Sequence, residues 1–153
     1  MIKLKDILLE AKAPNIFVPR RIEDRVERLI RDYIRNGGKG DLRLDSMNIT
    51  KLPSILLNVT VDGNFYCYEN NLTSLENSPK FVYGHFSCAS NNLTSLKGSP
   101  EYVGGFNCRF NKLKTLVGAP KKVGGFFICR NNSVKFTEEQ VRAICDVKGK
   151  IIV

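Results

Sequence analysis

The chain contains the stretch FYCYENNLTSL, residues 65–75, and comes back to it three more times along its length. The later copies are FSCASNNLTSL from Phe86, FNCRFNKLKTL from Phe106 and FICRNNSVKF from Phe127, which gives periods of 21, 20 and 21 residues. A diverged copy, LRLDSMNITKL, begins at Leu42, so five copies fill the chain from about residue 41 to residue 136. A fixed period of this length is typical of a solenoid in which each copy forms one coil.

Each full copy begins with a phenylalanine and has a cysteine two positions later, as at Phe65 and Cys67. This spacing is typical of a short β-strand with one buried face. One such strand is not stable alone, but strands stacked about 4.8 Å apart form a parallel sheet. We therefore expect short parallel strands whose Phe, Cys and Leu side chains form one continuous buried column.

The segments between these strands also repeat, and they leave only about ten residues for the return path. Pro79, Pro100 and Pro120 each follow a repeat leucine by four positions and remove a backbone donor, so helices are not expected there. An extended path or a short 3₁₀ turn is expected instead. A glycine two positions before each phenylalanine indicates a tight bend that a Cβ would obstruct; these glycines are Gly63, Gly84, Gly104 and Gly125.

The copies resemble the leucine-rich-repeat signature LxxLxLxxNxL, and they keep its phase over about 95 residues. The resemblance implies a leucine-rich-repeat solenoid with a short parallel β-sheet of about five coils. It also implies an inward ladder of asparagines that hydrogen-bond buried backbone groups; these are Asn70, Asn91, Asn111 and Asn132. Met47 stands at this position in the first copy, so we expect a distorted boundary coil there.

A solenoid needs caps over its terminal coils, and both flanks have a suitable pattern. Helical spacing of apolar residues over 20–36, ended by Gly37 and Gly38, predicts a capping helix within 20–40. Repeats are expected over 41–136 and a C-terminal cap over 137–153, opened by a capping box of Thr137 and Gln140. Residues 1–19 are expected to be a leader or linker. The apolar residues expected on the inner faces of the two helices are Ile22, Val26, Leu29, Tyr33 and Ile34, then Val141, Ile144 and Cys145, followed by a short strand at 151–153.

The short repeats look most like those of proteins encoded by tailed phages, and they have a looser resemblance to short-repeat bacterial effectors. Leu8, Leu9, Glu10 and Ala11 resemble the cleavage site of prohead proteases in T-even-type phages. This resemblance implies a capsid-targeting propeptide, residues 1–10, that is removed after Glu10 so that the mature protein is packaged in the virion. The alternative is an ordinary amphipathic N-terminus followed by a linker. Neither a bilayer-spanning run nor a secretory signal pattern is found, so we expect the virion or the host cytoplasm and no membrane partner.

The chain carries a formal net charge of +9, from 24 basic and 15 acidic residues. Such an excess favours an acidic partner, either protein, nucleic acid or an anionic surface. Up to Arg43 there are 11 basic and 7 acidic residues, and the remainder has 13 and 8, so both parts are mixed in sign. No module of interleaved aromatic and basic residues is visible, so we expect a protein partner rather than nucleic acid.

The five cysteines follow the repeat rather than a metal-binding pattern, because no CxxC pair exists and His85 is the only histidine. We expect no metal site. Neither a nucleophile with a recognisable base nor a phosphate-binding loop is present, so neither a catalytic site nor a cofactor is expected. The cysteines expected to be reduced and buried are Cys67, Cys88, Cys108, Cys129 and, in the terminal helix, Cys145.

The exposed strand residues are the remaining candidates for a functional site. In a strand whose Phe and Cys point inward, the residue between them and the residue after Cys point outward. Tyr and Arg are enriched in binding hot spots. The candidate partner-binding residues are Tyr66, Tyr68, Arg109, Phe110, Ile128 and Arg130, although ordinary exposed strand residues have the same pattern. The sequence therefore favours a non-catalytic protein–protein interaction module that acts on a host component. A virion structural protein and a basic nucleic-acid-binding protein are the alternatives.

Overall fold

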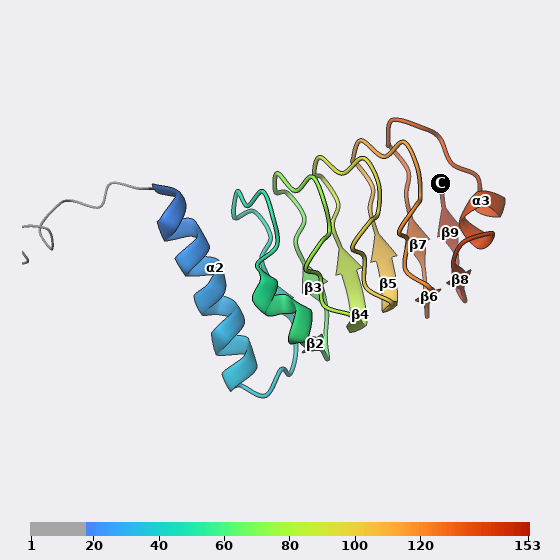
Figure 1. The fold of residues 1–153 in the computed structure, drawn as a ribbon. Coiled ribbons are helices and arrows are strands. Elements are labelled where there is room, and N and C mark those ends of the chain that lie inside the picture. Colours follow the sequence, from blue (N-terminus) through green and yellow to red (C-terminus); the bar gives the residue numbers. More distant parts are fainter. Residues whose placement is uncertain (1–17) are drawn as a thin grey trace, which may run out of the picture.

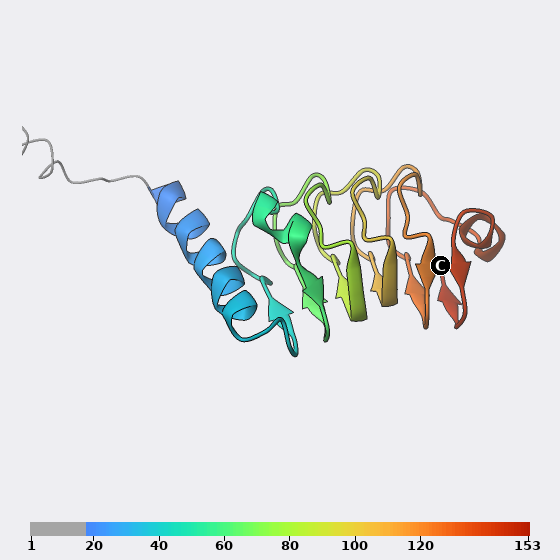
Figure 2. The same ribbon diagram turned by 60° about the horizontal axis from the view of Figure 1, so that its bottom comes forward.

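The computed structural model describes residues 18–153, which form a parallel β-solenoid of about five coils (Figure 1). The expected cleavage site at Glu10 and Ala11 lies outside the described residues, as does most of the expected leader. Helix α2 lies at one end of the stack and α3 at the other, as both views show (Figures 1 and 2). The elements are α2 (Val18–Arg35), β1 (Leu42–Arg43), the 3₁₀ helix η1 (Ser54–Asn58), β2 (Thr60–Val61), β3 (Phe65–Tyr66), β4 (Phe81–Ser87), β5 (Tyr102–Asn107), β6 (Lys122–Val123), β7 (Phe127–Ile128), α3 (Glu138–Arg142), β8 (Asp146–Val147) and β9 (Ile151–Ile152).

The repeat phenylalanines lie in one column of strands, as the sequence predicted. Phe65, Phe86, Phe106 and Phe127 occupy equivalent register positions on β3, β4, β5 and β7. Their rings lie against one another with centroids 5.2, 5.6 and 5.2 Å apart, and all four are fully buried. Removing each ring from water contributes about 2 to 3 kcal/mol before the entropy of ordering is set against it.

A second column of short strands, which the sequence pattern did not reveal, also runs through the stack. This column consists of β2, the first residues of β4, the first residues of β5, and the whole of β6 and β8. Neighbouring members of the column pair in parallel register. The buried row of this column consists of Val61, Val82, Val103, Val123 and Val147. The pattern was hidden because most of these strands have two residues, which is too short for an alternation to show.

The glycines before the phenylalanines lie where the chain passes from the second column to the first. A Cβ at Gly84 would lie 2.6 Å from the carbonyl oxygen of Gly63, and one at Gly104 would lie 2.2 Å from that of Tyr83. The expected obstruction is therefore present. Its cause is the close approach of the neighbouring coil's backbone, because these glycines do not have a left-handed conformation.

Helix α2 contributes Val26 and Ile30 to the same core as the repeats. The expectation that Ile34 lies on the inner face is wrong, since Ile34 is 45 % exposed while Ile30 is fully buried. At about 100° per residue, Ile34 lies at the edge of the apolar stripe. The Tyr33 hydroxyl accepts a hydrogen bond from the backbone N–H of Asp62 at 3.2 Å, which links the end of the helix to the second coil.

The C-terminal segment begins with the expected capping box. The backbone N–H of Gln140 donates to the Thr137 hydroxyl at 3.2 Å, and the N–H of Thr137 donates to Gln140 Oε1 at 2.9 Å. The expected burial of Ile144 is wrong: Val141 and Cys145, one helical turn apart, are buried, and Ile144 lies beside this narrow stripe and is 48 % exposed. The expected terminal strand is confirmed as β9, which pairs with β7.

Candidate functional site

The repeat asparagines hold the surface strands in register by bonding backbone groups of two successive coils. For Asn91, Nδ2 donates to the carbonyls of Cys67 at 3.0 Å and Cys88 at 3.1 Å, and Oδ1 accepts from the Leu72 N–H at 2.9 Å. Equivalent bonds are made by Asn70, Asn111 and Asn132. Backbone groups that would otherwise be buried without partners are thereby satisfied at each turn.

Each of these asparagines reaches back to the preceding coil, which accounts for Met47. Asn70 Oδ1 accepts from the N–H groups of Met47 at 3.0 Å and Ile49 at 3.1 Å. The first coil has no earlier coil to bond, and Met47 instead packs against the core. Leu42 pairs in register with Phe65, so the strand of this coil is regular. The turn around Met47 departs from the other coils, because both Ser46 and Asn48 are left-handed there.

The outward residues of the second coil form a packed aromatic pair. Tyr66 and Tyr68 meet edge to face with ring centroids 6.0 Å apart. The guanidinium of Arg43 lies 4.5 Å from the Tyr66 ring centre, and its Nη2 donates to the Tyr68 hydroxyl at 3.0 Å. Both tyrosines are therefore held in place by neighbours within the chain.

The third coil separates this pair from the other candidate residues. Its outward positions hold Ser87 and Ala89, which are only 8 % and 6 % exposed. The third coil therefore offers little accessible side-chain surface between the tyrosines of the second coil and Asn107 and Arg109 of the fourth. The six candidates lie on the second, fourth and fifth coils, on either side of this coil.

Phe110 is the most unusual of the six candidates. Its backbone is left-handed, with φ of 54°, and its side chain is 49 % exposed. A bulky residue in this conformation costs about 1 to 2 kcal/mol, and such strain concentrates at functional sites. The equivalent left-handed residues on the other coils are Ser46, Glu69, Ser90 and Asn131.

Arg109 and Arg130 lie beside Phe110. The guanidinium of Arg109 is 5.6 Å from the Phe110 ring centre, and its buried Nε has no hydrogen-bond partner among residues 18–153. The Phe110 N–H donates to the Arg130 carbonyl at 3.3 Å, so the fifth coil lies directly against the fourth here. Ile128 is partly buried between its register partners Asn107 and Ile152.

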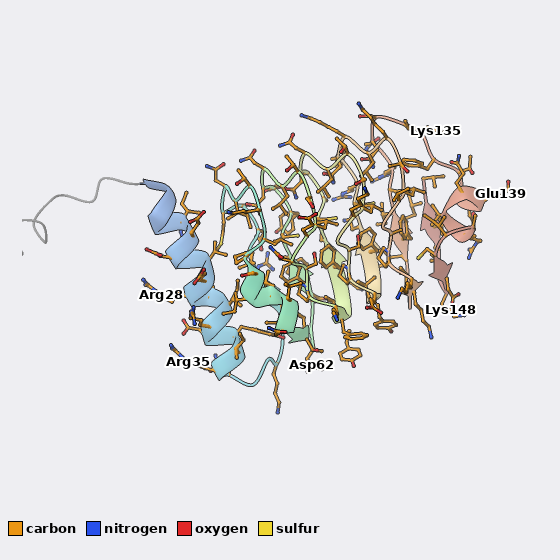
Figure 3. The ribbon with its side chains drawn as sticks, viewed as in Figure 1. Arg28, Arg35, Asp62, Lys135, Glu139 and Lys148 are labelled. Carbon is orange, nitrogen blue, oxygen red and sulfur yellow. The ribbon has the colours of Figure 1, made fainter. Side chains whose placement is uncertain are left out.

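The basic charge is concentrated on the fourth and fifth coils, which a comparison of the residues before and after Arg43 does not reveal. Residues 102–137 contain seven basic and no acidic residues, whereas residues 41–101 contain four basic and six acidic ones. Three exposed lysines, Lys112, Lys114 and Lys135, continue the surface beyond Arg109 and Arg130. Lys135 lies on the opposite edge of the stack from Asp62 and Lys148 (Figure 3).

The repeat cysteines are buried free thiols. Burial raises the pKa of Cys67, Cys88 and Cys108 well above the ordinary value, because the interior disfavours the thiolate. Burial likewise raises the pKa of Cys129 and of Cys145 to about 11. Thiols with such raised pKa values are poor nucleophiles at neutral pH.

His85 is exposed, and its ring packs edge to face on Phe126 with centroids 4.6 Å apart. Within residues 18–153, no group of three or more His, Cys, Asp or Glu residues is arranged to hold a metal ion. Over the same part of the chain, no helix has both the length and the apolar character needed to cross a membrane.

The described residues thus define a parallel β-solenoid with an aromatic pair on its second coil and a basic surface on its fourth and fifth. Compared with known protein families, curated proteins and solved structures, the chain has no match.

Proposed function

We propose that this protein is a non-catalytic protein-binding module of the leucine-rich-repeat type, and that Tyr66, Tyr68, Arg109 and Arg130 contact the partner. The observation that carries the proposal is the outward set of Tyr and Arg side chains on and directly after strands that are followed by the asparagine bonds. Rigid presentation lowers the entropy cost of binding, and Tyr and Arg are the side chains that most often dominate interfaces.

The leucine-rich-repeat type is supported by the regular asparagine bonds and by the buried Phe and Leu column. In the same proposal, α2 and the segment from Thr137 onward are caps. This role is supported by the burial of Val26, Ile30 and Val141, which cover apolar ends of the stack.

Charge reversal separates this surface from the rest of the molecule. Partners are captured from an extract of the cells in which the protein is made, with the wild-type chain as reference. We expect Arg109→Glu with Arg130→Glu, or Tyr66→Ala with Tyr68→Ala, to weaken capture by at least about 2 kcal/mol. The matched control is Arg28→Glu with Arg31→Glu on α2, which changes the net charge equally. Normal capture by the first two variants, together with loss in the control, would assign recognition to α2 instead.

The proposal extends to a phage origin, supported by the likeness of the repeats and of residues 8–11 to phage sequences. In this account residues 1–10 direct the chain into the capsid and are removed, and the mature protein acts on a host component in the cytoplasm. N-terminal sequencing of protein from purified particles tests it. We expect a chain beginning at Ala11, and a chain still beginning at Met1 would reject the packaging route.

A further inference from the structure

We infer that the corner of the fourth and fifth coils binds a short acidic peptide segment of the partner, with Phe110 contacting an apolar side chain of that segment. The inference rests on the proposed function and names the chemistry of the partner. The surface, called the basic corner below, consists of Arg109, Phe110, Lys112, Lys114, Arg130 and Lys135.

The five cations of the basic corner lie on adjacent coils. The Lys114 N–H donates to the Thr94 carbonyl at 3.0 Å, and the Val134 N–H donates to the Leu113 carbonyl at 3.2 Å. Leu113 and Val134 are thus paired across neighbouring coils. Because Lys114 follows Leu113 and Lys135 follows Val134, the two lysines lie side by side. Like charges so placed repel one another, and an anion bound between them removes the repulsion.

These cations also lack partners of their own. None of the five forms an ion pair within residues 18–153. On α2, by contrast, Arg31 pairs with Glu27 at 3.3 Å and Arg35 pairs with Asp32 at 3.0 Å. At the basic corner, five such cations lie on two adjacent coils with no acidic residue between residues 102 and 137, so an added carboxylate meets cations that are not already neutralised.

Phe110 gives the basic corner an apolar centre at a cost in backbone strain. The other coils have Ser, Glu or Asn at this position, so the turn itself does not require an aromatic ring. A ring 49 % exposed and flanked by Arg109 resembles the aromatic and arginine anchors found at the centres of protein interfaces. The segment is therefore expected to carry an apolar side chain among its carboxylates.

The charge changes sign along the same corner, which favours a short segment over nucleic acid. Asp45 and Glu69 occupy the positions on the first two coils that correspond to Arg109 and Phe110. Glu138 and Glu139 follow directly after the fifth coil. Asp45 is paired with Arg43 and Glu138 with Arg142. Within residues 18–153, the carboxylates at the two ends that form no ion pair are therefore Glu69 and Glu139. A long polyanion running along the corner would meet both of them, whereas a segment confined to two coils would not.

Fluorescence anisotropy with the full chain tests the inference. The probes are a labelled decapeptide of glutamates with one central leucine, the all-glutamate decapeptide and a single-stranded DNA of similar charge. We expect Lys114→Glu with Lys135→Glu to weaken binding of the leucine peptide about tenfold or more, and Arg28→Glu with Arg31→Glu to change it less than about threefold. Phe110→Asn should weaken binding of the leucine peptide but not of the all-glutamate peptide, and the denaturation midpoint should not fall.

The inference would be overturned if the leucine peptide did not bind, or if Arg28→Glu with Arg31→Glu weakened its binding as much as Lys114→Glu with Lys135→Glu. It would also be overturned if the DNA bound more tightly than the peptide and its binding were abolished in Lys114→Glu with Lys135→Glu. If the peptide fails while capture from extract still depends on Tyr66 and Tyr68, the protein-binding proposal stands and only the acidic segment is rejected. If capture fails and the peptide binds as expected, the tyrosine surface is rejected and the basic corner stands.

Discussion

Phe106 lies between Phe86 and Phe127, and its ring is within 5.6 Å of both neighbouring ring centroids. Because each coil contributes one phenylalanine ring to this column, Phe106 contacts both the coil before it and the coil after it. Its exposed counterpart on the same coils is Phe81, which lies at the start of β4 and is half-exposed. The two residues therefore allow burial to be separated from residue type.

We predict that Phe106→Ala or Phe86→Ala lowers the free energy of unfolding by about 3 to 5 kcal/mol, through lost burial and the cavity left behind. Phe81→Ala should cost clearly less, about 1 kcal/mol, since that residue is 40 % exposed. Denaturant unfolding of the three variants measures both values. A loss below about 1 kcal/mol at Phe106 would mean that the coils do not stack in this order.

At the scale of elements, the asparagine turn is the unit that repeats most faithfully. Asn91 makes four hydrogen bonds to buried or partly buried backbone groups of its own coil and the coil before it. We predict that Asn91→Ala lowers the free energy of unfolding by about 2 to 4 kcal/mol, because these groups lose their partners without access to water. Denaturant unfolding of Asn92→Ala, whose side chain is partly exposed, should show a change within about 0.5 kcal/mol. Equal effects of the two substitutions would contradict the ladder.

The strands that carry the phenylalanines were predictable because residues of one kind recur at a spacing of two in every copy. The second column was not, because Val61, Val82 and Val103 lie in short segments before a glycine bend, in which no spacing of two can be seen. The burial of Ile30 instead of Ile34 depends on how α2 lies against the first coil, which helical periodicity alone does not fix.

The individual residues of the candidate site could be predicted from the sequence, but their arrangement on the surface could not. Alternation along the strands identified Tyr66, Tyr68, Arg109 and Arg130. That Ser87 and Ala89 are nearly buried is a property of the assembled stack, which the alternation along one strand does not show. The left-handed backbone of Phe110 is a property of the turn, and no local sequence signal marks an aromatic residue for that conformation.

Across the whole molecule, the buried thiols couple stability to pH. Burial raises the pKa of all five thiols in the folded state, so the folded chain stays protonated where the unfolded chain ionises, above a pH of about 8.5. Their stabilisation is complete below that pH and is lost as the pH rises toward the folded pKa values, which are about 11 for Cys129 and for Cys145.

We predict that the free energy of unfolding falls between about pH 8.5 and about pH 9.5, and that each thiol contributes up to about 1.4 kcal/mol per pH unit. Cys88→Ala should make the slope shallower by about that amount, although it also lowers stability at neutral pH. Denaturant unfolding under reducing conditions measures the slope. A flat profile across this range would show that the thiols are not buried in the folded chain.

Site-specific photo-crosslinking is the most direct test of whether the face that carries Tyr66, Arg109 and Phe110 binds a protein. The photoreactive residue benzoylphenylalanine is placed at position 66 or 110, and for comparison at exposed Tyr83 beyond the second column. Each variant is irradiated in an extract of the cells in which the protein is made. Our account predicts the same crosslinked protein from positions 66 and 110 and none from position 83. A crosslink from position 83 alone, or equal products from all three positions, would contradict it.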